Sequence, residues 1–280
     1  MRKISFFRQI ASQLALILIG LYVLLPIWGI ARMAFDGSLI GRPTEFRVLP
    51  KVFSLDAFFK VLDRPYQSVN FHTLLQNSLV VSTGAALIAM ALGLSLAYAF
   101  ARYRFRGHKV GLFLILLTAL LPPIAFTTPL YIVLSILKIR TTLFALVITY
   151  AVFAMPFCVW NIRAAFQSVP RELEEAAFLD GAGNFATFRK IMLPLAVPSI
   201  AVAMLIAFLM AYSEFAIGWL FVDKADTVTL AMSIYAMLQN SAQPWSIMGS
   251  MALIMSAPVV VIFLLMQRTL LERMMFGEVH

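Results

Sequence analysis

One carboxylate stands in a part of the sequence where little water can reach it. Glu214 occurs in MAYSEFAIGW, directly after Ile191 to Ser213, a stretch without a charged side chain. An ionisable group inside a membrane span is costly, so it usually faces a cavity or a partner and marks a candidate functional site. Tyr212, Ser213 and Glu214 could together hydrogen-bond a hydroxylated solute in a transport pathway. The competing interpretation is that Glu214 is hydrogen-bonded between helices or at a subunit interface.

The sequence contains few residues that could bind a metal and no recognisable catalytic motif. His72, His108 and His280 are far apart and are expected on different sides of a membrane, and Cys158 is the only cysteine. An intrachain disulfide or a cysteine-based metal cluster is therefore impossible. We find no H-E-x-x-H pattern, no Ser, His and Asp arrangement and no G-x-x-x-x-G-K-[ST] phosphate loop. We predict no catalytic residue, no metal and no cofactor on this chain.

A polar run interrupts the apolar chain at residues 174–194, which read EEAAFLDGAGNFATFRKIMLP. Pro170 suits the first position of a helix. Carboxylates in the first turns are favoured by the helix dipole, and three follow Pro170, namely Glu172, Glu174 and Glu175. The pattern predicts a short helix that begins near Pro170.

The same run contains signals that end one helix and start another. Gly181 and Gly183 are expected to stop the first helix, because glycine readily adopts the left-handed conformation found after helix ends. Asn184 can cap a second helix, from about Phe185 to Met192, which Pro194 would then terminate. The predicted product is a helix, a tight turn and another helix, lying outside the membrane core.

One face of the first predicted helix carries mostly small side chains. Leu173, Ala176, Ala177 and Asp180 follow the i, i+3, i+4, i+7 spacing that places residues on one helical face. Alanines allow close approach and charges at the rim orient a partner, so this face is suited to a groove on another protein. An amphipathic loop resting on lipid headgroups explains the same residues equally well.

The elements that must position these residues are membrane spans. The chain is 62% hydrophobic and 12% charged, and its mean hydropathy is +0.91. Since about 20 apolar residues cross the hydrocarbon core, we predict six spans and an all-α membrane fold with both termini on one side. The spans fall in six stretches without a charged side chain: Gln9 to Ala31, Pro65 to Ala101, Val110 to Leu137, Thr141 to Ile162, Ile191 to Ser213 and Thr227 to Gln267.

Two of these stretches have a distinctive composition. The second contains Gly84, Gly93 and several alanines, which let helix backbones approach closely and predict a packed, central helix. The third contains LLPPIAFTTP. Its prolines, Pro122, Pro123 and Pro129, are expected to kink the helix against a cavity or a tight interface, where the freed carbonyls can be satisfied.

Lysine and arginine set the orientation, because positive charge is retained on the cytoplasmic side. Thirteen of the 22 basic residues would share one side with the termini and the polar loop, against nine on the other. We therefore predict that residues 165–195 and both termini are cytoplasmic. The net charge of +9 needs no nucleic-acid partner, because basic loops beside membrane lipid account for it.

The spacing of the polar loop resembles a known signature. E-A-A-x3-G-x9-I-x-L-P is the EAA motif of ABC-importer permeases, and its positions are occupied here by Glu175, Ala176, Ala177, Gly181, Ile191, Leu193 and Pro194. The segments NSLVVSTGAAL and AYAFARYRFRG and the end of the chain also resemble the MalG-like carbohydrate permeases, which belong to the binding-protein-dependent type I (MetI-like) importers. The resemblance covers nearly the whole chain and is loosest before residue 70.

The resemblance implies that the loop is a coupling helix that docks on a cytoplasmic ATPase. Glu175 and Asp180 would orient it, Ala176 and Ala177 would permit insertion, and Gly181 would provide the turn. It also implies a second, MalF-like permease subunit, an ATPase dimer that binds ATP and Mg²⁺, an extracytoplasmic solute-binding protein and a sugar or oligosaccharide as solute, with maltodextrin-like sugars favoured.

The expected organisation follows from these elements. Residues 1–70 would hold the N-terminus, the first span and an extracytoplasmic loop, residues 71–267 the permease core, and residues 268–280 a cytoplasmic tail. Three alternatives stay open: an ion-coupled secondary carrier, an ABC permease for another solute, and a membrane enzyme. A secondary carrier would be expected to have several intramembrane carboxylates or histidines, whereas Glu214 is the one evident here.

Overall fold

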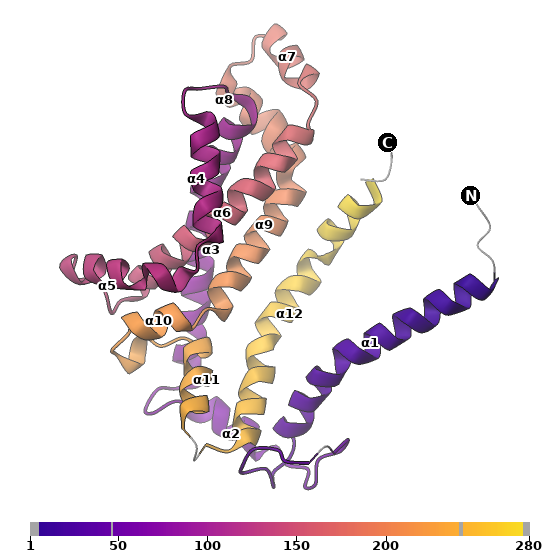
Figure 1. The fold of residues 1–280 in the computed structure, drawn as a ribbon, viewed down its shortest axis with the longest axis vertical. Helices are drawn as coiled ribbons and strands as arrows, with labels where there is room; N and C mark the ends of the chain where they lie inside the picture. The colour runs from indigo at the N-terminus through magenta and orange to yellow at the C-terminus, as the bar shows by residue number, and fades with distance from the viewer. Residues whose placement is uncertain (1–5, 46, 241–242, 277–280) are drawn as a thin grey trace. The chain divides into compact units, whose positions relative to one another are not determined.

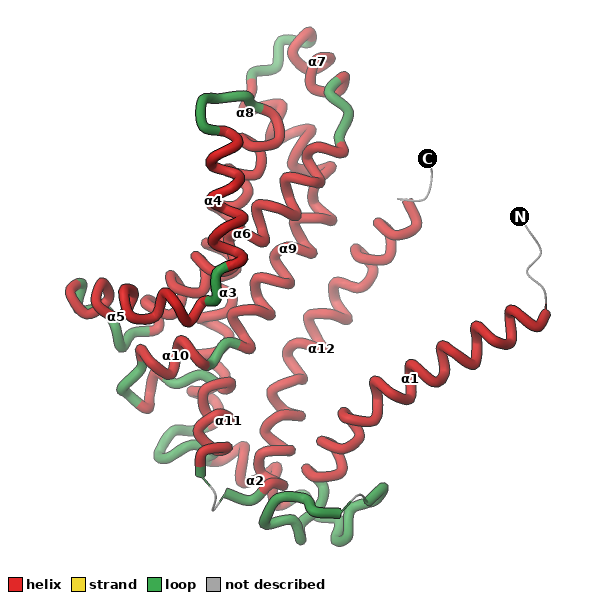
Figure 2. The backbone as a smooth tube through the Cα atoms, viewed as in Figure 1, coloured by secondary structure: helices red, strands yellow, loops and turns green. Residues whose placement is uncertain are grey.

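The computed structural model describes residues 6–45, 47–240 and 243–276, and these residues form helices joined by loops, without a strand (Figures 1 and 2). The chain divides into two compact units. One comprises the chain up to Phe71 together with Ile234–Ala257, and the other comprises His72–Ser233 together with the chain from Pro258. The C-terminal part of the predicted tail, residues 277–280, lies outside the described residues.

The first unit is built around α1 (Phe6–Ala34) and the loop that follows it. The loop leads to α2 (Asp56–Asp63). The start of α12 (Trp245–Phe276) packs against the end of α1, where the hydroxyl of Ser250 donates to the carbonyl of Ala34 at 3.2 Å. A Cβ atom added to Gly249 would lie 2.9 Å from the nitrogen of Ala34, so only glycine permits this approach.

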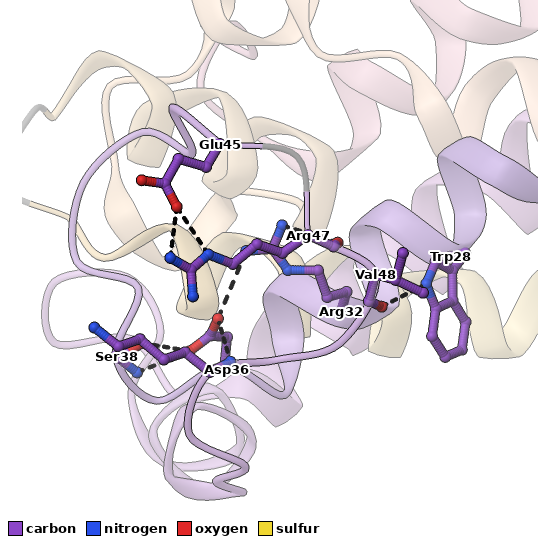
Figure 3. A network of polar contacts seen from close by, with 8 residues as sticks. Trp28, Arg32, Asp36, Ser38, Glu45, Arg47 and Val48 are labelled. Atoms are coloured by element: carbon purple, nitrogen blue, oxygen red, sulfur yellow. Dashed lines mark hydrogen bonds and ion pairs between the residues drawn. The ribbon is translucent and has the colours of Figure 1, made fainter.

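Asp36 organises the loop after α1 (Figure 3). Its carboxylate accepts hydrogen bonds from the hydroxyl of Ser38 at 2.6 Å and from the backbone N–H groups of Ser38 and Lys51, both at 3.1 Å. Arg32, one turn earlier, approaches the same carboxylate at 3.6 Å. Burial alone would raise the pKa of Asp36, but these hydrogen bonds outweigh it and lower the pKa to about 2.

Asp36→Asn is expected to loosen this loop. The pKa of the folded state lies below the ordinary value of 3.8, so the carboxylate contributes about 2 kcal/mol above pH 4, which is lost as the pH falls toward 2. Protease protection of residues 37–55 should therefore fall in the variant at pH 7 and, in the native chain, on acidification. Glu45→Gln is the matched control, because the exposed Glu45–Arg47 pair should contribute little.

Three long helices form the core of the second unit: α3 (Phe71–Arg102), α6 (Leu143–Ser168) and α9 (Leu193–Ser213). They pack through small residues. A Cβ atom on Gly84 would lie 3.1 Å from Val147, and one on Gly93 would lie 3.0 Å from the Cβ of Cys158. The prediction of a closely packed helix over the second span is therefore confirmed.

The third predicted span is broken more sharply than a kink. It consists of α4 (His108–Leu120), a 3₁₀ turn, η1 (Pro123–Phe126), and α5 (Thr127–Ile136), with an angle of 101° at the break (Figure 1). Pro122 and Pro123 lie at the break. Both lack the N–H that would continue the helix, which explains why the chain turns there.

The hydropathy reading of six spans is consistent with the helices found. Among the residues that the structure describes, five uninterrupted helices are long and apolar enough to cross a membrane, and the broken pair makes a sixth if it counts as one span. Three short helical segments follow α9: α10 (Ala216–Phe221), the 3₁₀ turn η3 (Ala225–Thr227) and α11 (Leu230–Gln239). The side-chain amide of Asn77 on α3 donates to the carbonyls of Asp226 and Val228 at 2.7 and 2.9 Å, which holds the segment before α11 against α3.

Candidate functional site

The polar loop folds as a helix, a turn and a second helical segment. The first helix is α7 (Glu172–Leu179), which ends at Asp180. Gly181 follows with a φ of +83°, in the left-handed region where a side chain is strained. Its N–H donates to the carbonyl of Phe178 at 3.0 Å, and that of Ala182 to Ala177 at 2.9 Å, which closes the helix end.

Two details of the second helical segment differ from the prediction. Gly183, not Asn184, stands at the cap position before α8 (Asn184–Thr187), and no side chain caps this helix. The segment also does not stop before Pro194. It continues through a π-helix, η2 (Phe188–Met192), directly into α9. Pro194 therefore lies inside a continuous helical segment, directly after the π-helix, and its missing N–H removes one hydrogen bond from that segment.

The side chains of the predicted coupling site face different ways. Glu175, Ala176, Asp180 and Gly181 are exposed, whereas Ala177 is buried against the rest of the chain. Further along the loop, Pro194 is exposed and two apolar side chains, Ile191 and Leu193, are half-buried. Of the two alanines in the motif, only Ala176 is therefore available to a partner.

Large apolar side chains surround these exposed positions. Leu179 is 89% exposed and Phe185 is 74% exposed, and Leu173 and Phe178 are also exposed. We call Leu173, Glu175, Ala176, Phe178, Leu179 and Phe185 the loop surface. Apolar side chains with this exposure beside carboxylates are typical of a protein-binding surface.

The sequence pattern missed two residues beneath the loop surface. The carboxylate of Glu174 is buried and forms an ion pair with Arg102, the last residue of α3. The one local signal for the burial of Glu174 was its i, i+3 spacing from Ala177, because this spacing places both residues on one face of the helix. Glu174 and Ala177 are the two buried residues of α7. The partner of Glu174, Arg102, could not be predicted from spacing, because Arg102 lies on another helix, far away in the sequence.

The second candidate site contains Tyr212, Ser213 and Glu214 at the end of α9, and the three side chains do not converge. Tyr212 is buried and stacked on Phe208, with ring centroids 5.5 Å apart. The exposed Ser213 donates to the carbonyl of Leu209 at 2.8 Å. Glu214 accepts from the N–H groups of Ile217 and Gly218 at 3.0 and 3.3 Å, and so closes the first turn of α10.

Glu214 nevertheless lines a cavity. The cavity has a volume of about 310 Å³ and lies between the proline break, α6, α9 and α10, with Pro122, Tyr150, Phe153, Met210 and Glu214 among its lining residues. Tyr150 approaches the carboxylate of Glu214 with its hydroxyl. The wall is otherwise almost wholly apolar, so the carboxylate and the phenol are the two ionisable groups that a solute would meet.

Glu214→Gln and Glu214→Ala separate the two roles of this side chain. Glutamine keeps an acceptor for the N–H groups of Ile217 and Gly218, whereas alanine removes it, which costs about 1 kcal/mol at a helix start. If Glu214 only supports α10, glutamine should preserve the thermal midpoint in detergent and the Michaelis constant for uptake. A raised Michaelis constant with an unchanged thermal midpoint would instead assign the carboxylate to the solute pathway.

The broken span and the packed long helices define an all-helical membrane protein, with the polar loop exposed at one end of its second unit. A family model described as "Binding-protein-dependent transport system inner membrane component" matches residues 89–276. The chain belongs to this family, and it is a multi-pass protein of the inner membrane.

Individual relatives agree with the family assignment. The chain is 30% identical over 203 residues to the "Probable ABC transporter permease protein YurM" of Bacillus subtilis, covering 72% of this chain and 68% of the relative. It is 25% identical over 271 residues to the maltodextrin transport system permease protein MdxG of the same organism, covering 96% and 95%. A bacterial ABC transporter involved in alginate import has the same fold, with a TM-score of 0.72, 21% identity and coverage of 96% and 99%.

Proposed function

We propose that this chain forms half of the translocation pathway of an ATP-driven importer for a sugar or oligosaccharide, and that α7 couples it to a cytoplasmic ATPase. The observation that carries the coupling role is the loop surface. The loop surface lies on an exposed helix that carries the EAA spacing. Its apolar side chains, Leu173, Phe178, Leu179 and Phe185, are exposed. Family membership supports the importer class.

The loop surface has the features that docking requires. Ala176 presents a small side chain between exposed neighbours, which allows a groove to approach the helix. Glu175 and Asp180 add exposed charge at the rim, which favours one orientation of the partner. Closure of an ATPase dimer on ATP and Mg²⁺ would move two such loops and tilt the spans attached to them.

The remaining subunits follow from the same proposal. A second permease, different from this chain, would complete the pathway, and an extracytoplasmic binding protein would deliver the solute. The basic residues favour a cytoplasmic location for the loop and both termini. ATP and Mg²⁺ would be bound by the ATPase alone.

For the solute we favour an oligosaccharide of the maltodextrin type. Similarity to MdxG over 96% of this chain supports that choice. Tyr212, Ser213 and Glu214 are proposed to border the pathway at the outer end of α9. Of the three, Glu214 is best placed to contact a solute, because it lines the cavity beside the proline break.

Reconstitution tests the proposal. The chain should be purified together with its partner permease, ATPase and binding protein, placed in liposomes and supplied with ATP inside. We expect ATP-dependent uptake of at least one of maltotriose, trehalose and diacetylchitobiose, and none when the ATPase is omitted. Uptake by this chain alone along an ion gradient would contradict the proposal and favour a secondary carrier.

A further inference from the structure

The contact that anchors α7 to the rest of its unit is charged. Along α7 the buried side chains are Glu174 and Ala177. The methyl group of Ala177 can slide over its neighbours at little cost, whereas an ion pair fixes both distance and direction. The Glu174–Arg102 pair is well shielded, because the side chains are 10% and 7% exposed. Shielded pairs are weakened little by salt.

Arg102 also contacts two other elements at the same end of the unit. Its Nη2 group donates to the carbonyl of Val169 at 2.8 Å. Val169 directly follows α6, where helix carbonyls lack intrahelical donors. The same group lies 3.8 Å from the sulfur of Met192, the last residue of η2. A single guanidinium therefore connects the end of α3 to α6, α7 and η2.

The packing around Arg102 is aromatic. The ring of Tyr98 lies 4.7 Å from Phe188, 5.5 Å from Phe166 and 5.8 Å from Tyr103, measured between centroids. These rings bring α3, α6 and η2 together. None of these rings belongs to α7, and the Arg102–Glu174 ion pair joins α7 directly to the end of α3.

The contact between α3 and α6 does not depend on Arg102. Arg163 of α6 donates through Nε to the carbonyl of Phe100 at 3.2 Å. Variants that break the Arg102–Glu174 pair should therefore leave the helix core assembled. Glu174 is buried and does not belong to the loop surface, so Glu174→Gln changes no exposed charge there.

We propose that Arg102 is a positioning residue for coupling, which transmits a displacement of α7 to α3 through its ion pair with Glu174. This inference rests on the proposed docking of α7 on an ATPase. When the ATPase moves α7, the ion pair moves the end of α3 with it, and α6 follows through Val169. Without the pair, α7 can move while α3 stays in place, and ATP is hydrolysed without transport.

Glu174→Gln tests this role in the reconstituted importer, since it removes the charge and keeps the shape. Three quantities are measured: the amount of ATPase bound, the rate of ATP hydrolysis, and uptake of the sugar that the native complex imports from the panel above. ATPase binding and hydrolysis should stay close to native, whereas uptake per ATP hydrolysed should fall about tenfold or more. Glu172→Gln is the matched control, because Glu172 is an exposed carboxylate of the same helix.

The charge-exchanged double variant, Arg102→Glu with Glu174→Arg, provides a second readout. It restores a pair of opposite charges, so it should recover part of the uptake per ATP that Arg102→Glu alone loses. The inference is overturned if Glu174→Gln lowers binding, hydrolysis and uptake in equal proportion, or if the double variant is no better than Arg102→Glu alone. Failure of the docking proposal is distinct, because the native chain would then bind no ATPase.

Discussion

Gly181→Pro is expected to abolish ATP-driven uptake while the membrane helices stay folded. Gly181 has a φ of +83°, whereas proline fixes φ near −65°. Proline also removes the N–H that donates to Phe178 at 3.0 Å. The turn after α7 cannot form with these two changes, so the loop surface loses its orientation. Uptake should fall by about a hundredfold, as expected when several kcal/mol of local structure are lost.

A graded series makes this prediction specific to backbone conformation. Gly181→Ala and Gly181→Val add a side chain where the left-handed conformation costs about 1–2 kcal/mol, so they should give intermediate losses, larger for valine. Gly183→Ala is the matched control, since Gly183 has a φ of −80° and a Cβ atom added there would meet no other atom within 4 Å. Native uptake by both the Gly181→Pro and the Gly183→Ala variants would show that the turn is not needed for coupling.

Glu175→Lys is expected to prevent assembly with the ATPase. Glu175 is exposed on α7 and belongs to the loop surface, so reversing its charge should leave the fold unchanged and place a like charge against whatever basic group it meets. Such reversals at an interface rim lower association and make it more dependent on salt. The bound ATPase should fall by about tenfold or more, the size of effect typical of a lost charged contact.

Glu172→Lys controls for the helix dipole. It places the same positive charge in the first turn of the same helix, where it opposes the dipole to a similar extent. Glu172 lies outside the loop surface, so assembly with the ATPase should persist. If both variants bind the ATPase equally well, Glu175 is not part of the interface.

Local patterns predicted most of the fold. Hydropathy located the long helices, since a stretch without charged residues reports burial in lipid without reference to neighbours. The glycines of the polar loop predicted its turn, and the positive φ of Gly181 confirms it. The small residues of α3 predicted its close packing, which Gly84 and Gly93 display.

The features that depend on contacts between distant residues were not predictable in this way. The prolines indicated a kink but not its size of 101°, and the contact of α5 with α10 joins residues far apart in the sequence. Spacing placed both motif alanines on one face, yet Ala177 is buried in the folded chain whereas Ala176 is exposed. The Arg102–Glu174 pair joins α3 to α7 through residues far apart in sequence, and no periodicity connects them.

Glu214 illustrates a related limit. Its position after an apolar span indicated a functional carboxylate, and the neighbouring hydroxyl groups of Tyr212 and Ser213 agreed with that interpretation. The residues that define its surroundings, Tyr150 and Pro122, come from other helices. Its hydrogen bonds to Ile217 and Gly218 show a local role as well, and its proposed role in the solute pathway stays a prediction.

Site-specific cross-linking tests the central claim, that α7 is where the ATPase docks. Cys158 is the single cysteine and is fully buried, so Cys158→Ala gives a cysteine-free background with a small change in packing. Leu179→Cys then places one thiol on α7, at a position that is 89% exposed. Leu49→Cys, at a position that is 67% exposed in the loop after α1, is the control on the side predicted to be extracytoplasmic. With a short bifunctional reagent in the assembled importer, Leu179→Cys should capture the ATPase and Leu49→Cys should not. Capture of the ATPase by the Leu49→Cys variant would contradict the account. So would the absence of capture by the Leu179→Cys variant in an intact and active complex.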